Sequence, residues 1–92
     1  MSITTEDIQQ AIRIKKAVAE HFANTDQAKI MAKDLMPLFI SKNIFTKDHK
    51  DGLPIRNFLR HLEENNHLHL IPQVHFEQKD SNKNWYFIKS NK

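Results

Sequence analysis

The spacing of apolar residues changes from a helical to a strand period near residue 66, and this change most constrains the fold. Before it, apolar residues recur every three or four positions, which is typical of amphipathic helices. After it, Leu68, Leu70, Val74 and Phe76 alternate with polar residues, which is typical of strands. A chain of 92 residues has room for one small domain. The sequence therefore predicts a single α+β domain over 1–92, in which three helices precede a C-terminal β-hairpin.

A first helix is expected over about 5–23. Thr4 or Thr5 can cap its start, and the acidic residues that follow favour a helix N-terminus electrostatically. Lys15 falls within the apolar face on a helical wheel, and its long stem lets the ammonium group reach water at the edge of that face. The residues that we expect this helix to bury are Ile8, Ala11, Ile12, Val18, Ala19 and Phe22.

Two further helices are expected over about 32–43 and about 54–66. Pro37 is compatible with the second helix only near its start, where the missing N–H is not needed. The third helix follows Gly52, the only glycine of the chain, and has Pro54 in its first turn. Its apolar face follows a regular helical spacing and comprises Ile55, Phe58, Leu59 and Leu62.

The last part of the chain, about 67–89, is expected to form the β-hairpin. Its second strand contains residues 85–88, which are rich in aromatic side chains, and the polar segment 79–84 forms the turn. Pro72 cannot donate a ladder hydrogen bond, so the first strand should lie at a sheet edge or bulge there. Residues 28–31 are compatible with a further brief strand.

The order of these elements resembles the winged helix-turn-helix superfamily. The resemblance covers nearly the whole chain and rests on element order and pattern, without a diagnostic motif. It implies that the helix at 54–66 is a recognition helix for the major groove of DNA and that the hairpin contacts phosphates. The segment 44–53 is longer than the tight turn usual in that family. The resemblance thus predicts a DNA-binding transcriptional regulator or accessory factor.

The distribution of charge indicates which residues would contact DNA. Basic residues exceed acidic ones by three, and all of this excess lies in residues 79–92. The expected recognition helix carries arginines, which can read guanine or grip phosphate, and an asparagine, which can read adenine, opposite its apolar face. Lysines of the hairpin and of the second helix can reach phosphates. The predicted nucleic-acid-binding residues are Arg56, Asn57, Arg60, Lys79, Lys83, Lys33 and Lys42.

An alternative function is protein–protein interaction or dimerisation without nucleic-acid binding. A net charge of +3 is small for a protein that binds DNA tightly. Glu63 and Glu64 directly follow the arginines and would repel phosphate. The fold class does not decide between the two functions. We therefore expect double-stranded DNA as the partner, with a homodimer or another protein as the alternative.

Six histidines raise the question of metal binding. His67, His69 and His75 would share one face of the predicted first strand, which is a pattern found in some metal sites. The chain has no cysteine, and Glu77 is the only nearby carboxylate, so we expect no bound metal or other cofactor. The charged loop 48–52 does not have the ligand spacing of a calcium loop. No nucleophile has a positioned base, so we do not expect an enzyme.

The N-terminal segment lacks the basic and apolar parts of a secretory signal. No apolar run approaches the ~20 residues that a membrane-spanning helix needs. The absence of cysteine fits a reducing compartment. Together these features predict a cytoplasmic protein without membrane contact.

Overall fold

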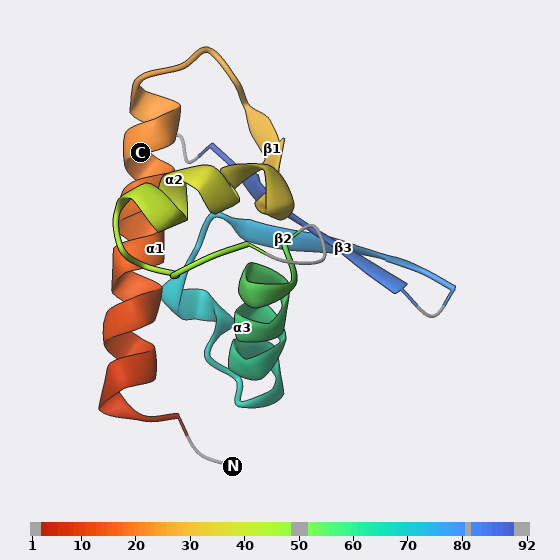
Figure 1. Cartoon of the computed structure of the whole chain (residues 1–92). Helices are drawn as coiled ribbons and strands as arrows, with labels where there is room; N and C mark the ends of the chain where they lie inside the picture. Colours follow the sequence, from red (N-terminus) through yellow and green to blue (C-terminus); the bar gives the residue numbers. More distant parts are fainter. Residues whose placement is uncertain (1–2, 49–51, 81, 90–92) are drawn as a thin grey trace.

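The computed structural model describes residues 3–48, 52–80 and 82–89. These residues form three α-helices, two short 3-10 turns and a three-stranded antiparallel sheet, and the predicted α+β class is confirmed. Figure 1 shows α1 (Thr5–Ala23) along one side of the molecule and the hairpin projecting from the opposite side. The core lies between them, because side chains from all three helices and from the sheet bury their apolar faces against one another.

α1 begins with a capping box that involves Thr4 and Asp7. The Thr4 hydroxyl accepts the Asp7 N–H at 3.1 Å, and the Asp7 carboxylate accepts the Thr4 N–H at 3.1 Å. The predicted buried face is wrong in part, because Ile12 is 39% exposed and Ala19 is also exposed. One residue advances a helix by about 100°, so the positions beside the buried stripe turn toward solvent. The buried residues are Ala11, Ile14, Ala17, Val18 and Phe22.

The second helical segment does not form one α-helix over 32–43 as predicted. A 3-10 turn, η1 (Ala32–Leu35), leads into the short helix α2 (Met36–Ser41). Pro37 explains the division, because it has no N–H to donate to the carbonyl of Lys33 four residues earlier. The N–H of Met36 bonds to that carbonyl instead, which is a 3-10 hydrogen bond. Pro37 thus lies in the first turn of α2, where proline is tolerated.

α3 (Leu53–Glu64) begins one residue earlier and ends two residues earlier than predicted. Its start depends on Gly52, which has a φ of 89°. A Cβ atom at this position would lie 2.5 Å from the Cβ and 2.8 Å from the Cα of Lys33, so η1 leaves no space for a side chain. The carboxylate of Asp48 accepts the Gly52 N–H at 2.8 Å. The sole glycine therefore sets how closely α3 approaches η1.

The prediction that the first hairpin strand begins at His67 is wrong. Residues Leu68–Leu70 form the 3-10 turn η2, which packs on α1 and α3, and the strand β2 begins only at Val74 (Val74–Lys79). Pro72 cannot donate to a strand ladder, which explains why regular pairing starts beyond it. The alternation of leucine and histidine in this segment reflects a turn that packs its leucines against the core rather than a strand.

The sheet has the strand order β1-β3-β2, with β3 (Asn82–Ile88) in the centre. The brief strand β1 (Lys29–Met31), expected at 28–31, pairs with the end of β3 that is remote from the hairpin turn. Alternation along β3 buries Trp85 and Phe87, as the strand period requires. The opposite face remains partly exposed, and there the ring of Tyr86 stacks on that of His75 at 5.9 Å.

Candidate nucleic-acid interface

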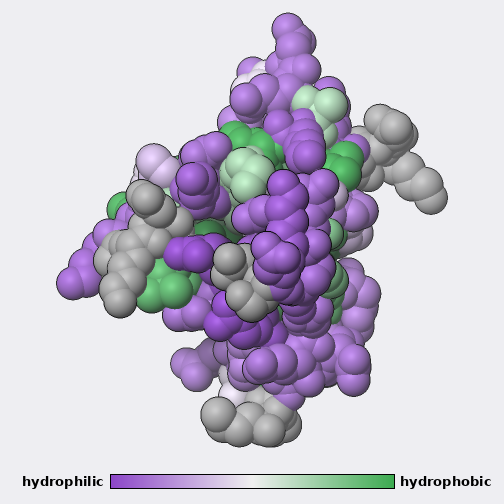
Figure 2. Space-filling view, turned by 90° about the vertical axis from the view of Figure 1, so that its right-hand side faces the viewer, coloured by the Kyte–Doolittle hydropathy of each residue, from purple (hydrophilic) through white to green (hydrophobic). Residues whose placement is uncertain are grey.

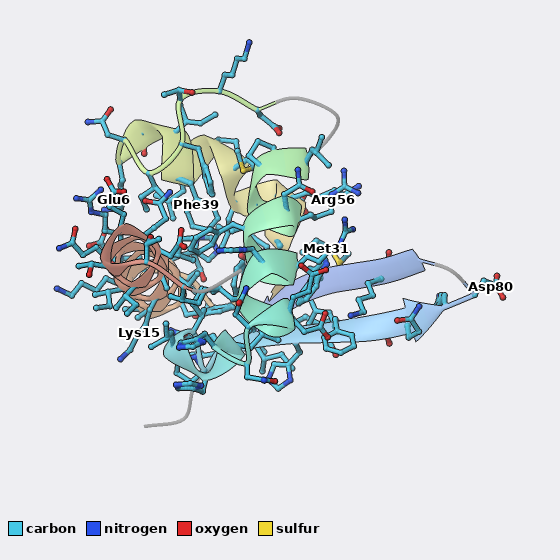
Figure 3. The ribbon with its side chains drawn as sticks, turned by 90° about the horizontal axis from the view of Figure 1, so that it is seen from below. Glu6, Lys15, Met31, Phe39, Arg56 and Asp80 are labelled. Carbon is cyan, nitrogen blue, oxygen red and sulfur yellow. The ribbon has the colours of Figure 1, made fainter. Side chains whose placement is uncertain are left out.

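A hollow of about 460 Å³ lies between the exposed face of α3 and the hairpin, and we call it the α3–hairpin cleft. In Figure 3 the hairpin strands continue past α3 toward Asp80, on the side of α3 away from α1, and Arg56 points to that side. The cleft thus combines one helix face with the projecting part of the sheet. Its lining residues are Arg56, Arg60, Glu63, Glu64, Gln78, Lys83 and Trp85.

Helical and strand periodicity together bring these residues to one place. Arg60, Glu63 and Glu64 share the face of α3 that carries Arg56, and this face lies beside the buried stripe. On the hairpin, Gln78 and Lys83 are directly paired across β2 and β3, so both side chains leave the same face of the sheet. Trp85 has the same orientation as Lys83, and it is 2% exposed.

Lys83 is held in the cleft by several contacts. Its ammonium group forms an ion pair with the Glu63 carboxylate, and each side chain is 27% exposed. The Lys83 Nζ also lies 4.6 Å from the centroid of the Phe76 ring and 5.6 Å from that of Trp85. These contacts hold the ammonium group against α3 and the rings. The sequence led us to expect that a hairpin lysine extends freely toward phosphate. Lys83 does not, because these contacts restrain it.

The two arginines have different surroundings. Arg56 is partly buried, and its Nε donates to the Gly52 carbonyl at 3.4 Å, which holds it near the first turn of α3. Arg60, one turn further along, is exposed. Glu63 and Glu64 lie one turn beyond Arg60, so three cations and two carboxylates line the cleft. The cleft is only weakly positive in sum.

The other predicted DNA-contacting residues are placed differently. Lys33 is exposed, and its Cα and Cβ atoms lie beside Gly52, at the same end of α3 as Arg56. Asn57 is exposed on α3 outside the lining of the cleft. Lys79 alternates with Gln78 along β2, so its side chain leaves the opposite face of the hairpin. Of the two hairpin lysines predicted to reach DNA, Lys83 therefore lines the cleft with the two arginines, whereas Lys79 does not.

Lys42 lies apart from the cleft, against α1. Its Nζ forms an ion pair with Glu20 at 2.7 Å. It belongs to a second hollow of about 430 Å³, which we call the α1–α2 hollow. This hollow is lined by Arg13, Lys16, Ala17, Glu20, Lys42 and Ile44. The sequence predicted that Lys42 reaches phosphate from the second helix, whereas the packing of α2 on α1 places it at this separate hollow.

The three histidines expected on one strand face are separated by the fold. His67 and His69 lie at η2, where their rings stack at 5.7 Å, whereas His75 lies on β2 and stacks on Tyr86. The prediction of a shared strand face is therefore wrong, because η2 replaces the first part of that strand. Among the residues that the structure describes, no three His, Asp or Glu side chains are grouped to hold a metal ion. In the loop 48–52, residues 49–51 lie outside the described part.

His61 and Asp7 join α3 to the start of α1. The Nε2 atom of His61 lies 3.0 Å from the Asp7 carboxylate. This hydrogen bond from His61, with those from Thr4, lowers the pKa of Asp7 from its ordinary value of 3.8, although burial acts in the opposite direction. The contact fixes the far end of α3 relative to α1, and it lies outside the lining of the cleft.

Sequence reasoning did not assign Gln78 and Trp85 to this site, and it treated Glu63 only as a charge that repels phosphate. The alternation of the second strand was the signal that places Trp85 beside Lys83. The pairing of Gln78 with Lys83 requires the hairpin register, and the Glu63 contact requires the packing of α3 against the hairpin.

The surface around the cleft is polar. Figure 2 faces the side from which the hairpin projects, and it shows mostly hydrophilic residues with hydrophobic ones in separate small areas. Such a surface suits a charged or polar partner better than an apolar one. Within the described ranges, no helix is long and apolar enough to cross a membrane. No protein-family model matches the chain, and neither does a curated protein or a solved structure.

Proposed function

We propose that the chain is a small winged-helix protein that binds double-stranded DNA, as a transcriptional regulator or accessory factor, with α3 in the major groove and the hairpin beside the phosphates. The observation that carries the proposal is the convergence of Arg56 and Arg60 with the hairpin in one cleft. Guanidinium groups on an exposed helix face suit base edges and phosphates alike. The proposal includes a cytoplasmic location, on the argument from cysteine usage.

The arrangement of the elements also supports this proposal. The brief strand β1 joins the hairpin in one sheet, so the short strand expected at 28–31 is present beside the helices and the hairpin. α3 carries the exposed Arg60 and the partly buried Arg56 beside the projecting hairpin, and Lys33 adds a cation at its N-terminal end. A helix beside a projecting hairpin, with a further cation nearby, lets one protein contact both a groove of DNA and the adjacent phosphate backbone.

The charge of the cleft sets the expected strength of binding. Glu63 neutralises Lys83, so the cations that remain for phosphate contact are few. Affinity for DNA falls with salt in proportion to the number of phosphates neutralised. We therefore expect modest affinity for a monomer with a shallow salt dependence.

The test compares two double variants that remove the same charge. Binding of a fluorescent duplex is measured by anisotropy at low salt for Arg56→Ala/Arg60→Ala and for Arg13→Ala/Lys16→Ala. Arg13 and Lys16 line the α1–α2 hollow, so this pair controls for net charge. We expect the first variant to weaken binding about tenfold or more and the second about threefold or less. Equal losses, or no binding by the wild-type protein, would contradict the proposal.

The second candidate is an interaction or dimerisation module that binds protein instead of DNA. The mixture of three cations and two carboxylates in the cleft favours it, because such mixed charge also suits a protein surface. Light scattering after size exclusion distinguishes the candidates. A stable dimer that dissociates in Arg56→Ala/Arg60→Ala, together with no affinity for DNA, would support this second function.

A further inference from the structure

We infer that Glu63 limits the affinity of the α3–hairpin cleft for DNA, because it holds Lys83 in an ion pair that a phosphate has to replace. This inference rests on the proposed function and concerns the regulation of the same site. It assigns to Glu63 the role of an internal competitor for phosphate. It assigns to Lys83 the role of a cation that contacts DNA only when Glu63 is neutralised or displaced.

Lys83 is enclosed by a carboxylate and two aromatic rings. Its ammonium group contacts the Glu63 carboxylate and the faces of the Phe76 and Trp85 rings. Those rings are themselves packed together, with centroids 5.1 Å apart. A lysine held by a carboxylate and two rings occupies one position rather than sampling many. Moving it to a phosphate would break all three contacts at once.

The ion pair reduces the counterion release that Lys83 can contribute to DNA binding. A free lysine that contacts DNA releases about one counterion from the phosphates, and this release drives binding. When Lys83 is already neutralised by Glu63, a nearby phosphate meets a neutral pair and gains little. The carboxylate also repels that phosphate directly. The ion pair therefore removes one potential phosphate contact from the cleft.

The Glu63–Lys83 ion pair lies inside the α3–hairpin cleft. Glu63 and Lys83 line the same cleft as Arg60, on the side of α3 that faces the hairpin. A DNA backbone that lay between α3 and the hairpin would pass the pair itself. By contrast, Glu77 lies on β2 next to Gln78 and points to the other face of the hairpin. Glu77 is exposed, so it provides a matched control for the loss of one negative charge.

The experiment measures duplex DNA affinity by anisotropy over a range of salt concentrations. Glu63→Gln should bind about tenfold more tightly at ~50 mM salt, with a logarithmic salt slope steeper by about 0.9, because Lys83 becomes available to one phosphate. Glu77→Gln should tighten binding about threefold or less, with an unchanged slope. Thermal unfolding followed by circular dichroism verifies that each variant is folded at the temperature of the binding assay.

Lys83→Gln tests the inference from the other partner. In the wild-type background it should weaken binding about threefold or less, because Lys83 is already neutralised and the loss comes only from the Glu63 carboxylate that it leaves unpaired. In the Glu63→Gln background the same substitution should abolish the entire gain. A Glu63→Gln/Lys83→Gln double variant that binds DNA as tightly as Glu63→Gln would overturn the inference, because the gain would then not depend on Lys83.

The outcomes separate the inference from the proposed function. If wild-type binding depends on Arg56 and Arg60 but Glu63→Gln behaves like Glu77→Gln, the inference is wrong and the proposed function stands. If neither the wild-type protein nor Glu63→Gln binds duplex DNA, both are wrong. Tighter binding by Glu63→Gln that requires Lys83 supports both.

Discussion

The α3–hairpin cleft and the α1–α2 hollow have similar volumes, and each contains one lysine–glutamate ion pair. The surroundings of the two pairs differ. Lys83 and Glu63 are each 27% exposed and lie beside two aromatic rings, whereas the side chains of Lys42 and Glu20 are 35% and 59% exposed. A lysine–glutamate pair thus restrains the ammonium group in the cleft and leaves it more solvated in the hollow, because burial and neighbouring rings decide how freely that group can move.

The largest effect should come from removing the aromatic floor of the cleft. Trp85→Ala should lower the free energy of unfolding by about 3–5 kcal/mol, because a buried indole leaves a large cavity. Ile44→Ala, at the α1–α2 hollow, should cost about 2–3 kcal/mol. Urea unfolding is followed by circular dichroism. Tryptophan fluorescence cannot be used for this variant, because Trp85 is the only tryptophan. A smaller loss for Trp85→Ala than for Ile44→Ala would show that the hairpin is not anchored by Trp85.

Gly52→Ala should displace the start of α3, which forms one side of the α3–hairpin cleft, and leave the α1–α2 hollow unchanged. The positive φ and the contact with the Lys33 backbone should together cost about 2 kcal/mol or more in the free energy of unfolding. Gly52→Asn should be similarly destabilising, because asparagine tolerates the backbone angle but still carries a Cβ atom. Asn43→Gly provides the control, since Asn43 also has a positive φ, of 60°. This control should change stability by about 0.5 kcal/mol or less, and a stable Gly52→Asn variant would contradict the steric argument.

Double-mutant cycles should sharpen the contrast between the two ion pairs. We expect a coupling free energy of about 1 kcal/mol between Lys83 and Glu63, which are partly shielded from water. For Lys42 and Glu20 we expect about 0.3 kcal/mol, as for an exposed pair. Chemical denaturation of the single and double glutamine variants at low salt gives both values. Equal couplings would mean that the aromatic rings do not strengthen the cleft pair.

The smallest effect concerns Asp7, which links α1 to α3 away from both hollows. Its lowered pKa means that the unfolded state binds a proton more readily than the folded state. This contribution to stability is therefore present above the ordinary value of 3.8 and is lost as pH falls through the lower folded pKa. Asp7→Asn should cost about 0.5 kcal/mol at neutral pH, and the difference from wild type should shrink on acidification.

Unfolding at a series of pH values measures this effect. Glu6→Gln is the control, because Glu6 also lies in the first turn of α1 but is not the capping carboxylate. A constant difference between wild type and Asp7→Asn from neutral to acidic pH would contradict the assignment of the His61 and Thr4 hydrogen bonds.

Most of the local structure follows from patterns that are visible in the sequence. The capping residues place the start of α1, and the apolar spacing of Ile55, Leu59 and Leu62 places α3. The errors occur where two local signals compete. In α2 the helical pattern continued through Pro37, and before β2 the alternation of leucine and histidine resembled a strand but belongs to η2. In both places a proline decides the hydrogen bonding, and periodicity does not report it.

The sequence by itself determined the order of the elements, the arginine-bearing face of α3 and the faces of β3, because these depend on the periods of helices and strands. Only the tertiary structure decided which partners the charges have. Lys83 meets Glu63 and Lys42 meets Glu20 across elements that are far apart in sequence. Such contacts depend on the angle between elements and on the reach of each side chain. The sequence predicted a basic hairpin, whereas in the structure the Glu63 carboxylate of α3 neutralises Lys83, the hairpin lysine that lines the cleft.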